Sequence, residues 1–274
     1  YWSAGKGGNQ WPGGPRDHWS AAFISFTMND PEWKSSIAHR TYMKDAKDNR
    51  NLALSGEDVS SKFVALSEGR YVKLSDVDVS SYATEIAEKY NIDPHLSELI
   101  VQEADKIFYG FDGFVLTFKD GILVPNAGID TSNIMPGYAI LYPEDSFKSA
   151  KILKSEIKKL FGTDNGIIIT DSRLMPTRIG TTGVAIASSG VKPIEDERGK
   201  TDLFGNSIRV TQKAIADDLS SAAQLLMGEC DESIPIVIIR DSNLIISDND
   251  QSSQTFSVGF DECIFIKGLS NSKI

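Results

Sequence analysis

The stretch Gly166-Ile167-Ile168-Ile169-Thr170-Asp171-Ser172 decides how the fold is interpreted. Its three successive isoleucines form a continuous apolar run, which is typical of a strand covered on both faces by other elements. A carboxylate and a hydroxyl follow the run at once. Open α/β sheets commonly place ligand groups beyond the carboxyl ends of their strands, so Asp171 is a candidate functional residue on this pattern alone.

Two amphipathic helices are predicted, one before and one after this strand. The first begins after Asp145-Ser146, which can cap it, carries apolar residues at heptad spacing over 150–160, and is expected to end at Gly162. The second has an apolar stripe over 215–226 and ends at Gly228, since glycine commonly follows the last helical residue. The apolar strand 234–239 follows, so helix and strand bracket an acidic loop.

Two hairpins and two helices are predicted before residue 126. Phe63-Val64-Ala65-Leu66 and Tyr71-Val72 flank a Ser-Glu-Gly turn, which predicts the first hairpin. The second is predicted at Asp120-Gly121, a strong short-range turn signal between two apolar runs. Between the hairpins, one helix is expected from Ser80-Ser81 to about residue 90, and Asp93-Pro94 opens another. These elements predict a mixed α/β fold.

Length, charge and composition exclude several classes of protein. The 274 residues, 41% of them hydrophobic, can bury the core of one large domain or two small ones. A net charge of −10 disfavours a sequence-independent nucleic-acid binder, and metal ions must offset the repulsion if phosphates are handled. The two cysteines and three histidines lack the spacing of a zinc site. No apolar run spans a bilayer and no signal-peptide pattern opens the chain, so the cytoplasm is the expected location.

The two ends of the sequence differ from its middle. All four tryptophans and the Gly/Pro-rich stretch 7–15 lie at the start, and residues 1–50 show no helical or alternating periodicity. They are interpreted as an irregular N-terminal extension. Residues 51–250 contain the regular pattern and form the predicted main domain. Residues 251–274 are expected to be a C-terminal tail that packs on this domain or is partly disordered.

Three segments place oxygen-bearing side chains on turns beside apolar elements. They are 126–133, 170–172 and 228–229. Carboxylate, hydroxyl and amide oxygens are the ligands that Mg²⁺ and Mn²⁺ prefer. A structural alternative exists for each segment: Asp130 and Asn133 can form Asx turns, Asp171 can belong to a strand-end turn, and Glu229 can be a solvated loop charge.

A series of short blocks occurs in the order known from one enzyme family. The blocks are Ser67-Glu68-Gly69-Arg70, Asn126-Ala127-Gly128-Ile129-Asp130, Ser132-Asn133, Ile169-Thr170-Asp171-Ser172, Gly183-Val184-Ala185-Ile186, Arg198-Gly199, Asp202-Leu203-Phe204-Gly205, Val210-Thr211, Ala216-Asp217-Asp218-Leu219 and Leu226-Met227-Gly228-Glu229. On these blocks the chain resembles the coenzyme F-420:L-glutamate ligases, which add γ-linked glutamate to a deazaflavin. The resemblance implies a γ-glutamyl ligase domain over residues 51–250, with mixed sheets, flanking helices and an intertwined homodimer.

The resemblance also implies which residues form the site. Asp130 and Asp171 match ligands of one divalent metal ion and are the candidate catalytic residues. Ser172 and Glu229 match ligands of a second ion. The residues that match nucleotide contacts of the family are Ser61, Lys62, Asn133 and the loop of Met227, Gly228, Glu229, Cys230, Asp231, Glu232, Ser233 and Ile234.

Substrates and cofactors follow from the same resemblance. GTP is the implied phosphoryl donor, with two Mg²⁺ or Mn²⁺ ions and with K⁺ as a further candidate. L-Glutamate and a deazaflavin precursor are the implied substrates, and an acyl phosphate is the implied intermediate, because a carboxylate is a poor electrophile until one oxygen joins a leaving group. A folate is the alternative acceptor, and a catalytically weakened nucleotide-binding relative is the alternative class.

Four basic residues could contact anionic groups of the substrates. They are Arg173, Arg178, Arg198 and Lys200. Arginine and lysine bind phosphate and carboxylate oxygens, although a surface ion pair is an equal alternative for each of these four. The aspartates at 217 and 218 fall early on a predicted helix, where a carboxylate favours the helix dipole and a structural role is at least as expected as catalysis.

The chain departs from the family pattern at three places. Residues 1–50 do not resemble the family's opening strand and nucleotide-contacting loop. The stretch 172–178 replaces a threonine and a Gly-Arg-Pro run, although a serine hydroxyl keeps the ligand chemistry. The stretch 142–147, Tyr-Pro-Glu-Asp-Ser-Phe, replaces a Pro-x-Asp-Pro-Asp run and is closer to relatives thought to glutamylate folates. These departures leave the acceptor open.

Overall fold

The computed structural model describes residues 63–232, 234–239, 247 and 256–270. The predicted N-terminal extension lies outside these residues. So do Ser61, Lys62 and Ser233 of the predicted nucleotide site. Within the described ranges, no helix is long and apolar enough to cross a membrane.

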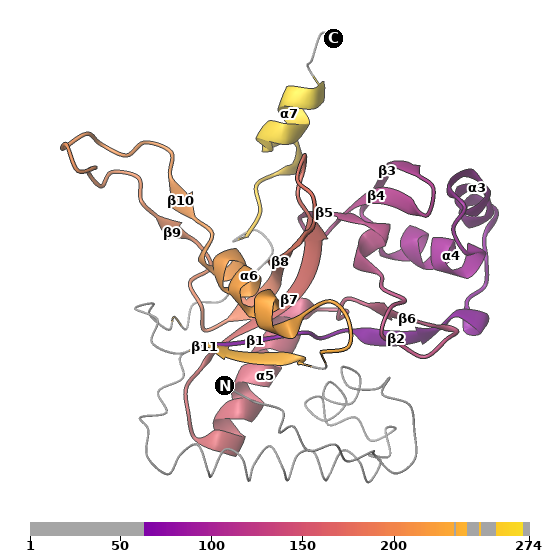
Figure 1. Ribbon diagram of the computed structural model, residues 1–274, viewed down its shortest axis with the longest axis horizontal. Coiled ribbons are helices and arrows are strands. Elements are labelled where there is room, and N and C mark those ends of the chain that lie inside the picture. The colour runs from indigo at the N-terminus through magenta and orange to yellow at the C-terminus, as the bar shows by residue number, and fades with distance from the viewer. Residues whose placement is uncertain (1–62, 233, 240–246, 248–255, 271–274) are drawn as a thin grey trace.

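The chain forms runs of strands separated by helices (Figure 1). The strands are β1 Phe63–Leu66, β2 Arg70–Lys73, β3 Lys106–Phe111, β4 Phe114–Lys119, β5 Ile122–Pro125, β6 Tyr138–Leu141, β7 Gly166–Leu174, β8 Thr181–Ser189, β9 Glu195–Asp196, β10 Gln212–Lys213 and β11 Ile236–Ile239. The helices are α3 Ser81–Tyr90, α4 Pro94–Glu103, α5 Ser146–Phe161, α6 Ile215–Met227 and α7 Ile264–Ser270, with short 3₁₀ turns η1 Leu74–Asp76, η2 Asn126–Gly128 and η4 Phe260–Glu262.

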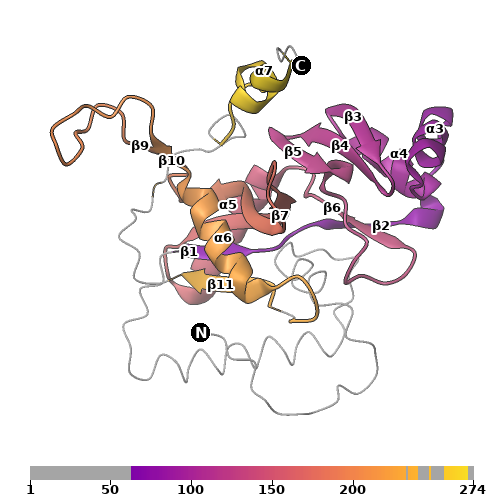
Figure 2. The same ribbon diagram turned by 45° about the horizontal axis from the view of Figure 1, so that its top comes forward.

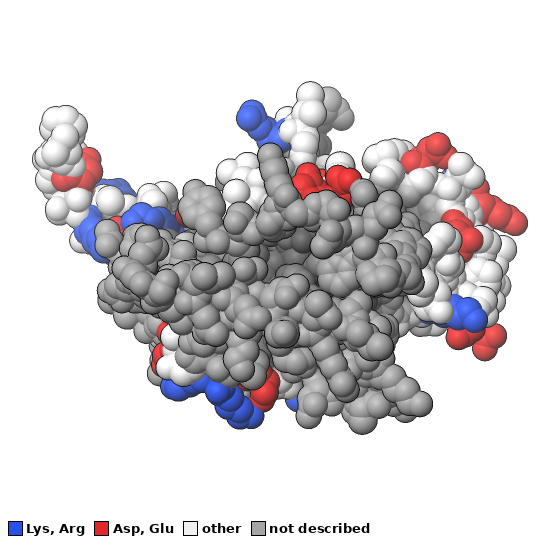
Figure 3. Space-filling model, turned by 60° about the horizontal axis from the view of Figure 1, so that its bottom comes forward, with Lys and Arg blue, Asp and Glu red and all other residues white. Residues whose placement is uncertain are grey.

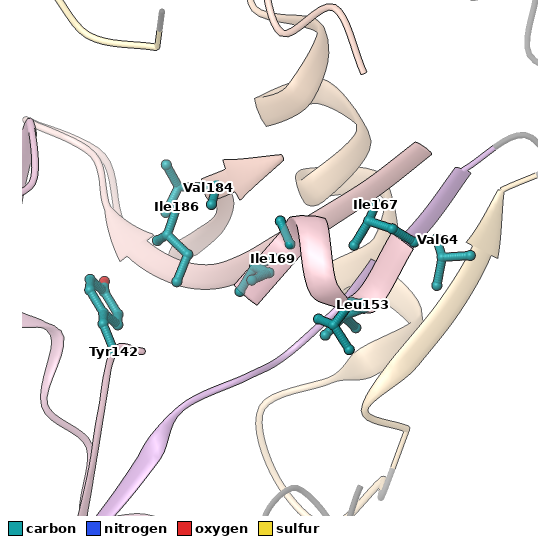
Figure 4. Packing of buried hydrophobic residues seen from close by; sticks show 10 residues of the cluster. Val64, Tyr142, Leu153, Ile167, Ile169, Val184 and Ile186 are labelled. Carbon is teal, nitrogen blue, oxygen red and sulfur yellow. The ribbon is translucent and has the colours of Figure 1, made fainter. Parts of the chain in front are cut away.

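The isoleucine run of β7 lies at the centre of the main sheet. This sheet has the strand order β11-β1-β7-β8, with β1 parallel to β7 and the other neighbours antiparallel. Ile167 and Ile169 pack with Leu153 of α5 (Figure 4). Ile168 packs in a different cluster, with Ala216 of α6. The two helices therefore cover opposite faces, as the continuous apolar run predicts. Burying one such side chain contributes about 1.5–3 kcal/mol.

The first predicted hairpin is wrong. β1 does not pair with β2: it pairs with β7 and β11, while β2 pairs with β6 in a separate sheet. A buried strand has two edges whose backbone groups need partners, and β7 and β11 satisfy both edges of β1. The turn at 67–69 instead connects β1 of the main sheet to β2 of the β2-β6 sheet. A Cβ on Gly69 would lie 2.6 Å from the Leu141 carbonyl oxygen, so this close approach requires glycine.

The second hairpin and the two early helices are confirmed. β4 and β5 are joined by Asp120 and Gly121, which both have positive φ, as a two-residue hairpin turn requires. Ser80 caps α3 by accepting a backbone hydrogen bond from its first turn, and Asp93 does the same for α4, which begins with Pro94. Local signals were sufficient here because each of these elements is stabilised by neighbours in sequence.

Residues 70–141 form a second unit beside the main sheet (Figure 2). The two sheets β2-β6 and β3-β4-β5, with α3 and α4, enclose a core that includes Ile100, Val115 and Leu141. The C-terminal segment packs onto this unit, because the Phe260 ring stacks on Phe108 at 5.4 Å between ring centroids. The described part of the tail is thus tied to the rest of the chain by aromatic contacts.

A hairpin-like arm, residues 195–213, projects away from the body (Figures 1 and 2). β9 and β10 form its base, and the side chains of Leu203 and Phe204 near its turn are 92% and 86% exposed. Basic side chains gather near the base of the arm, whereas acidic ones gather at the opposite end of the molecule, in the unit that holds α3 and α4 (Figure 3). Charge is therefore unevenly distributed over this face.

Candidate active site

A β-bulge lies immediately before Asp171. Ile169 pairs with Ala187 but Thr170 pairs with Ala185, so Ile186 of β8 has no partner in the ladder. β7 is buried up to Thr170 and partly exposed beyond it. The strand predicted to end at Thr170 in fact continues to Leu174. Asp171 therefore lies where β7 leaves the core, and bulges of this kind commonly re-aim side chains beside functional sites.

The Tyr142 hydroxyl holds the Asp171 carboxylate. It donates a hydrogen bond of 2.7 Å to Asp171 Oδ2, and the Tyr142 side chain is buried at one end of the main core cluster (Figure 4). Gly128 makes room for the ring, since a Cβ there would lie 2.3 Å from ring atom Cζ of Tyr142. Arg70 fixes the same residue from behind by donating from Nε to the Tyr142 carbonyl oxygen at 3.1 Å.

Burial and neighbouring charges raise the pKa of Asp171 to about 6. Loss of hydration is the largest cause. Hydrogen bonds from Tyr142 and from the Ser172 backbone oppose it, while the carboxylates of Asp130 and Glu229 raise the pKa further. The three carboxylates that the sequence analysis selected are therefore within electrostatic range of one another. Such a site favours the binding of a proton or a cation.

Asp130 forms the Asx turn that was its structural alternative. Its Oδ1 accepts from the Ser132 backbone N at 2.7 Å and its Oδ2 accepts from the Ser132 hydroxyl at 2.8 Å. Reciprocal backbone hydrogen bonds with Ile140, of 3.0 and 2.8 Å, attach this segment to β6. Asn133 follows with a φ of 49° and is exposed. Each carboxylate oxygen keeps a lone pair, so the turn is compatible with a ligand role, which stays a prediction.

The loop after α6 brings Glu229 to the β7–β8 turn. Glu229 Oε1 accepts from the Thr181 hydroxyl at 3.0 Å and from the side-chain amide of Gln224. Cys230 and Asp231 are exposed, whereas Met227, Gly228 and Ile234 are partly buried. These residues were predicted to contact the nucleotide, and no nucleotide contact is tested by the structure.

Glu232 folds back over this loop. Its Oε2 accepts a hydrogen bond of 2.8 Å from the Cys230 backbone N. A Cβ on Gly228 would lie 2.1 Å from the Glu232 carboxyl carbon, so the carboxylate occupies the space above this glycine. The backbone N–H of Cys230, a donor suited to a phosphate oxygen, is thus paired with a carboxylate oxygen within the same loop.

The binding of two divalent cations stays a prediction, and each ion would have few protein ligands. In the described part of the chain, no group of three or more His, Cys, Asp or Glu side chains is close enough to hold one ion. The pairs predicted from the resemblance, Asp130 with Asp171 and Ser172 with Glu229, supply two ligands each. Mg²⁺ typically binds one or two carboxylates and completes its shell with water and substrate phosphates, so oxygen pairs of this kind suit it.

Of the four basic residues considered, Arg173 lies at this site, and a substrate contact of Arg178 stays a prediction. Its Nη2 is 3.9 Å from Asp217 Oδ2, and its charge acts on the Tyr142 hydroxyl. Arg198 and Lys200 belong to the arm, where each pairs with acidic neighbours. The alternative of surface ion pairs is therefore confirmed for these two residues.

Sequence reasoning missed Tyr142 and Gly128. The sequence drew attention to Tyr142 only because residues 142–147 depart from the family pattern. A hydrogen bond between residues 29 positions apart has no local signature in the sequence. Tyr142 also lines a cavity of ≈ 250 Å³ together with Asp120, Glu144 and Phe147. A recess with acidic residues in its lining therefore adjoins Tyr142, the residue that holds Asp171.

Comparison with known proteins identifies relatives of the whole central region. A family model described as F420-0:Gamma-glutamyl ligase matches residues 39–241. The coenzyme F420:L-glutamate ligase of Methanopyrus kandleri is 42% identical over 178 residues, which cover 65% of this chain and 71% of that protein. The enzymes of the same name from Methanocaldococcus jannaschii and Methanothermobacter thermautotrophicus are 39% and 38% identical, over 68% and 66% of this chain and 75% and 73% of their own lengths.

Proposed function

Because this chain belongs to the F420-0:gamma-glutamyl ligase family, we propose that it joins L-glutamate to the carboxylate of a coenzyme F420 precursor. The chain is an amide-forming ligase. GTP and two divalent cations, Mg²⁺ or Mn²⁺, are proposed as its phosphoryl donor and metal ions. The observation that carries this proposal is the partly buried Asp171, which Tyr142 holds in place within range of two further carboxylates.

The proposed reaction has two chemical steps. An oxygen of the acceptor carboxylate attacks the γ-phosphorus of GTP, so that GDP leaves and an acyl phosphate forms. The amine of glutamate then attacks the acyl carbon, loses a proton, and displaces inorganic phosphate to leave the amide. Divalent ions, when bound, neutralise the charge that develops on the transferred phosphoryl group.

The protein's own contribution is positioning and electrostatics. Asp130, Asp171 and Glu229 carry negative charge at one place, where cations and not phosphates would be bound directly. Tyr142 fixes the orientation of Asp171 through its hydroxyl, and Gly128 fixes the orientation of Tyr142 by admitting its ring. A metal ligand held by a second residue in this way keeps its geometry when substrates enter.

The acidic recess beside Tyr142 suits the amine of glutamate. Asp120, Glu144 and Asp145 line it, and carboxylates attract an ammonium group. Its volume of ≈ 250 Å³ admits a small polar substrate more readily than a deazaflavin or a folate. We assign the recess to the amino acid and expect the larger acceptor to approach from the open side of the site.

A homodimer is part of the same proposal. The arm carries exposed apolar side chains, Leu203, Phe204 and Val210, at 84–92% exposure, far from the core of its own chain. Monomeric proteins rarely expose contiguous apolar groups of this size without a partner surface. Light scattering on the purified protein tests this assignment: a mass of one chain at micromolar concentration contradicts it.

Phosphate release tests the reaction. The purified protein is incubated with L-glutamate, GTP and Mn²⁺, with the deazaflavin precursor in one arm and a folate in the other. Release and amide formation that require the deazaflavin support the proposal. Release that requires the folate assigns the alternative acceptor, and no release with either acceptor favours the weakened nucleotide-binding relative.

A further inference from the structure

Arg173 is the cationic side chain that the structure places beside Asp171. It stands two residues further along β7, and its side chain is 28% exposed. The Arg173 charge lowers the pKa of Tyr142, whereas Asp171 raises it, so the guanidinium lies within electrostatic range of the Tyr142–Asp171 hydrogen bond. A positive charge therefore stands within electrostatic range of the residue that holds Asp171.

Most side-chain hydrogen-bond donors of Arg173 have no partner among the residues that the structure describes. Its guanidinium forms an ion pair there with Asp217, from Nη2 to Oδ2, and 3.9 Å is too long for a hydrogen bond. Its Nε is buried and has no acceptor there. A guanidinium carries five N–H donors, and a sheltered donor that is unpaired costs free energy. A ligand with acceptor oxygens would satisfy these donors.

Asp217 anchors Arg173 from the opposite side. It lies in the first turn of α6, and its Oδ1 accepts a hydrogen bond of 3.0 Å from the Ala185 backbone N, next to the bulge in β8. α6 can approach β8 closely because residue 183 is glycine: a Cβ there would lie 2.4 Å from the Ser220 carbonyl oxygen. The second carboxylate oxygen of Asp217, Oδ2, faces Arg173.

From this geometry we infer that Arg173, held by Asp217, forms an anion subsite that binds two oxygens of a phosphate or carboxylate group beside Asp171. Its planar fork matches the oxygens of either group in a bidentate contact. Two substrate groups have this chemistry: a phosphate of the nucleotide and a carboxylate of the acceptor or of glutamate. That the anion is a substrate group rests on the proposed function.

Direct binding measurements test the subsite. The probes are tripolyphosphate, GTP with Mn²⁺, and L-glutamate, each titrated calorimetrically into wild-type protein, Arg173→Ala and Arg173→Lys. Arg173→Ala is expected to lower the affinity of the protein for at least one of the probes roughly 10-fold to 100-fold, because the substitution removes charge-assisted hydrogen bonds. Arg173→Lys restores charge without the fork and should recover only part of that affinity. Arg198→Ala, which removes an arginine already paired with Asp196 on the arm, is the matched control and should change no affinity.

The pattern of losses identifies the source of the anion. Weaker tripolyphosphate and GTP binding with unchanged glutamate binding assigns a phosphate, and the reverse assigns a carboxylate. Equal affinities for all probes in wild type and Arg173→Ala, at an unchanged thermal unfolding midpoint, overturn the subsite. So does a wild-type protein that binds none of them. If Arg173-dependent binding persists but no acceptor supports turnover, the subsite stands and the proposed reaction fails.

Discussion

Asp171 and Asp196 are the same residue type in opposite electrical settings. Asp171 leaves the core at the bulge of β7, where lost hydration raises its pKa to about 6. Asp196 lies on the solvated arm, where hydrogen bonds from Arg198 lower its pKa to about 2. The difference between the two pKa values comes from the surroundings, since the free side chains are identical.

The arm satisfies its own charges and the site does not. Glu195, Glu197, Lys200 and Lys213 form a closed network of ion pairs between 2.8 and 3.4 Å. At the site, the carboxylates of Asp130 and Glu229 raise the pKa of Asp171 instead. Carboxylates without paired cations mark a place prepared for a ligand, whereas paired ones mark structure.

The largest effect is expected at Asp171. Asp171→Asn keeps the side-chain volume but removes the charge, and turnover with Mn²⁺ should fall by more than about 100-fold, beyond the loss typical of residues that only support a ligand. Asp196→Asn on the arm should leave turnover within about twofold, because its charge is screened and far from the reaction. Initial rates of phosphate release measure both. If turnover fell equally in the two variants, the site and the arm would not differ in their importance for the reaction.

The pH dependence of stability at Glu68 provides a second comparison between a buried carboxylate and the carboxylates of the arm. Glu68 is buried, and loss of hydration raises its pKa from 4.5 to about 7. Its stabilising contribution is complete below about pH 4.5 and is lost as pH rises to about 7, with an upper bound of about 3 kcal/mol. Glu68→Gln should remove this decline from the free energy of unfolding, measured by urea titration at pH 5 and pH 8.

Glu195 on the arm is the matched control for Glu68. Lys213 and Lys200 lower its pKa, so its contribution is present at high pH and is lost as pH falls. Glu195→Gln should therefore leave the decline between pH 5 and pH 8 unchanged. A wild-type stability that is flat over this interval would refute the assignment of the pKa shift of Glu68 to burial.

Tyr142→Phe is expected to have a smaller effect than loss of Asp171. The ring still fills the core, but Asp171 loses the hydrogen bond that orients it, which should reduce kcat/KM about 10-fold. Because that hydrogen bond lowers the pKa of Asp171, its removal should move the acidic limb of the pH–rate profile to higher pH. Tyr109→Phe, at a side chain that is 83% exposed, is the control. An unshifted profile would contradict the positioning role.

The smallest effect is expected on the arm. Lys213→Ala removes contacts to Glu195 and Glu197 at 3.2 and 2.8 Å, yet Lys200 still contacts both carboxylates, and of these four groups only Glu197 is buried. The thermal unfolding midpoint should not change measurably at 0.15 M salt, since exposed pairs contribute little. A clear drop that disappears at 1 M salt would show that the arm network stabilises the fold.

Local signals in the sequence predicted much of the fold. The caps Ser80, Asp93 and Asp145 begin helices where expected, and Asp120-Gly121 joins two strands. The isoleucine run of β7 is covered on both faces. These features depend on residues a few positions apart, so their energetics are contained in short stretches of chain.

Pairing between distant segments was not predictable in the same way. Phe63-Val64-Ala65-Leu66 was assigned to a hairpin because its neighbour in sequence was the nearest candidate, whereas its partners are 166–169 and 236–239. The strand β7 was expected to end at Thr170, and the bulge that carries it on to Leu174 depends on the register with β8. Which strands pair, and where a strand ends, depends on how residues are buried across the whole sheet.

By itself, the sequence determined many of the local elements, the family and the candidate carboxylates at 130, 171 and 229. The tertiary structure decided what surrounds them: the Tyr142 hydroxyl on Asp171, the room for its ring at Gly128, and Arg173 facing Asp217. The physical reason is that hydration is lost and charges interact only when the chain is folded. A pKa of about 6 for Asp171 is therefore a property of the assembled site and of no segment within it.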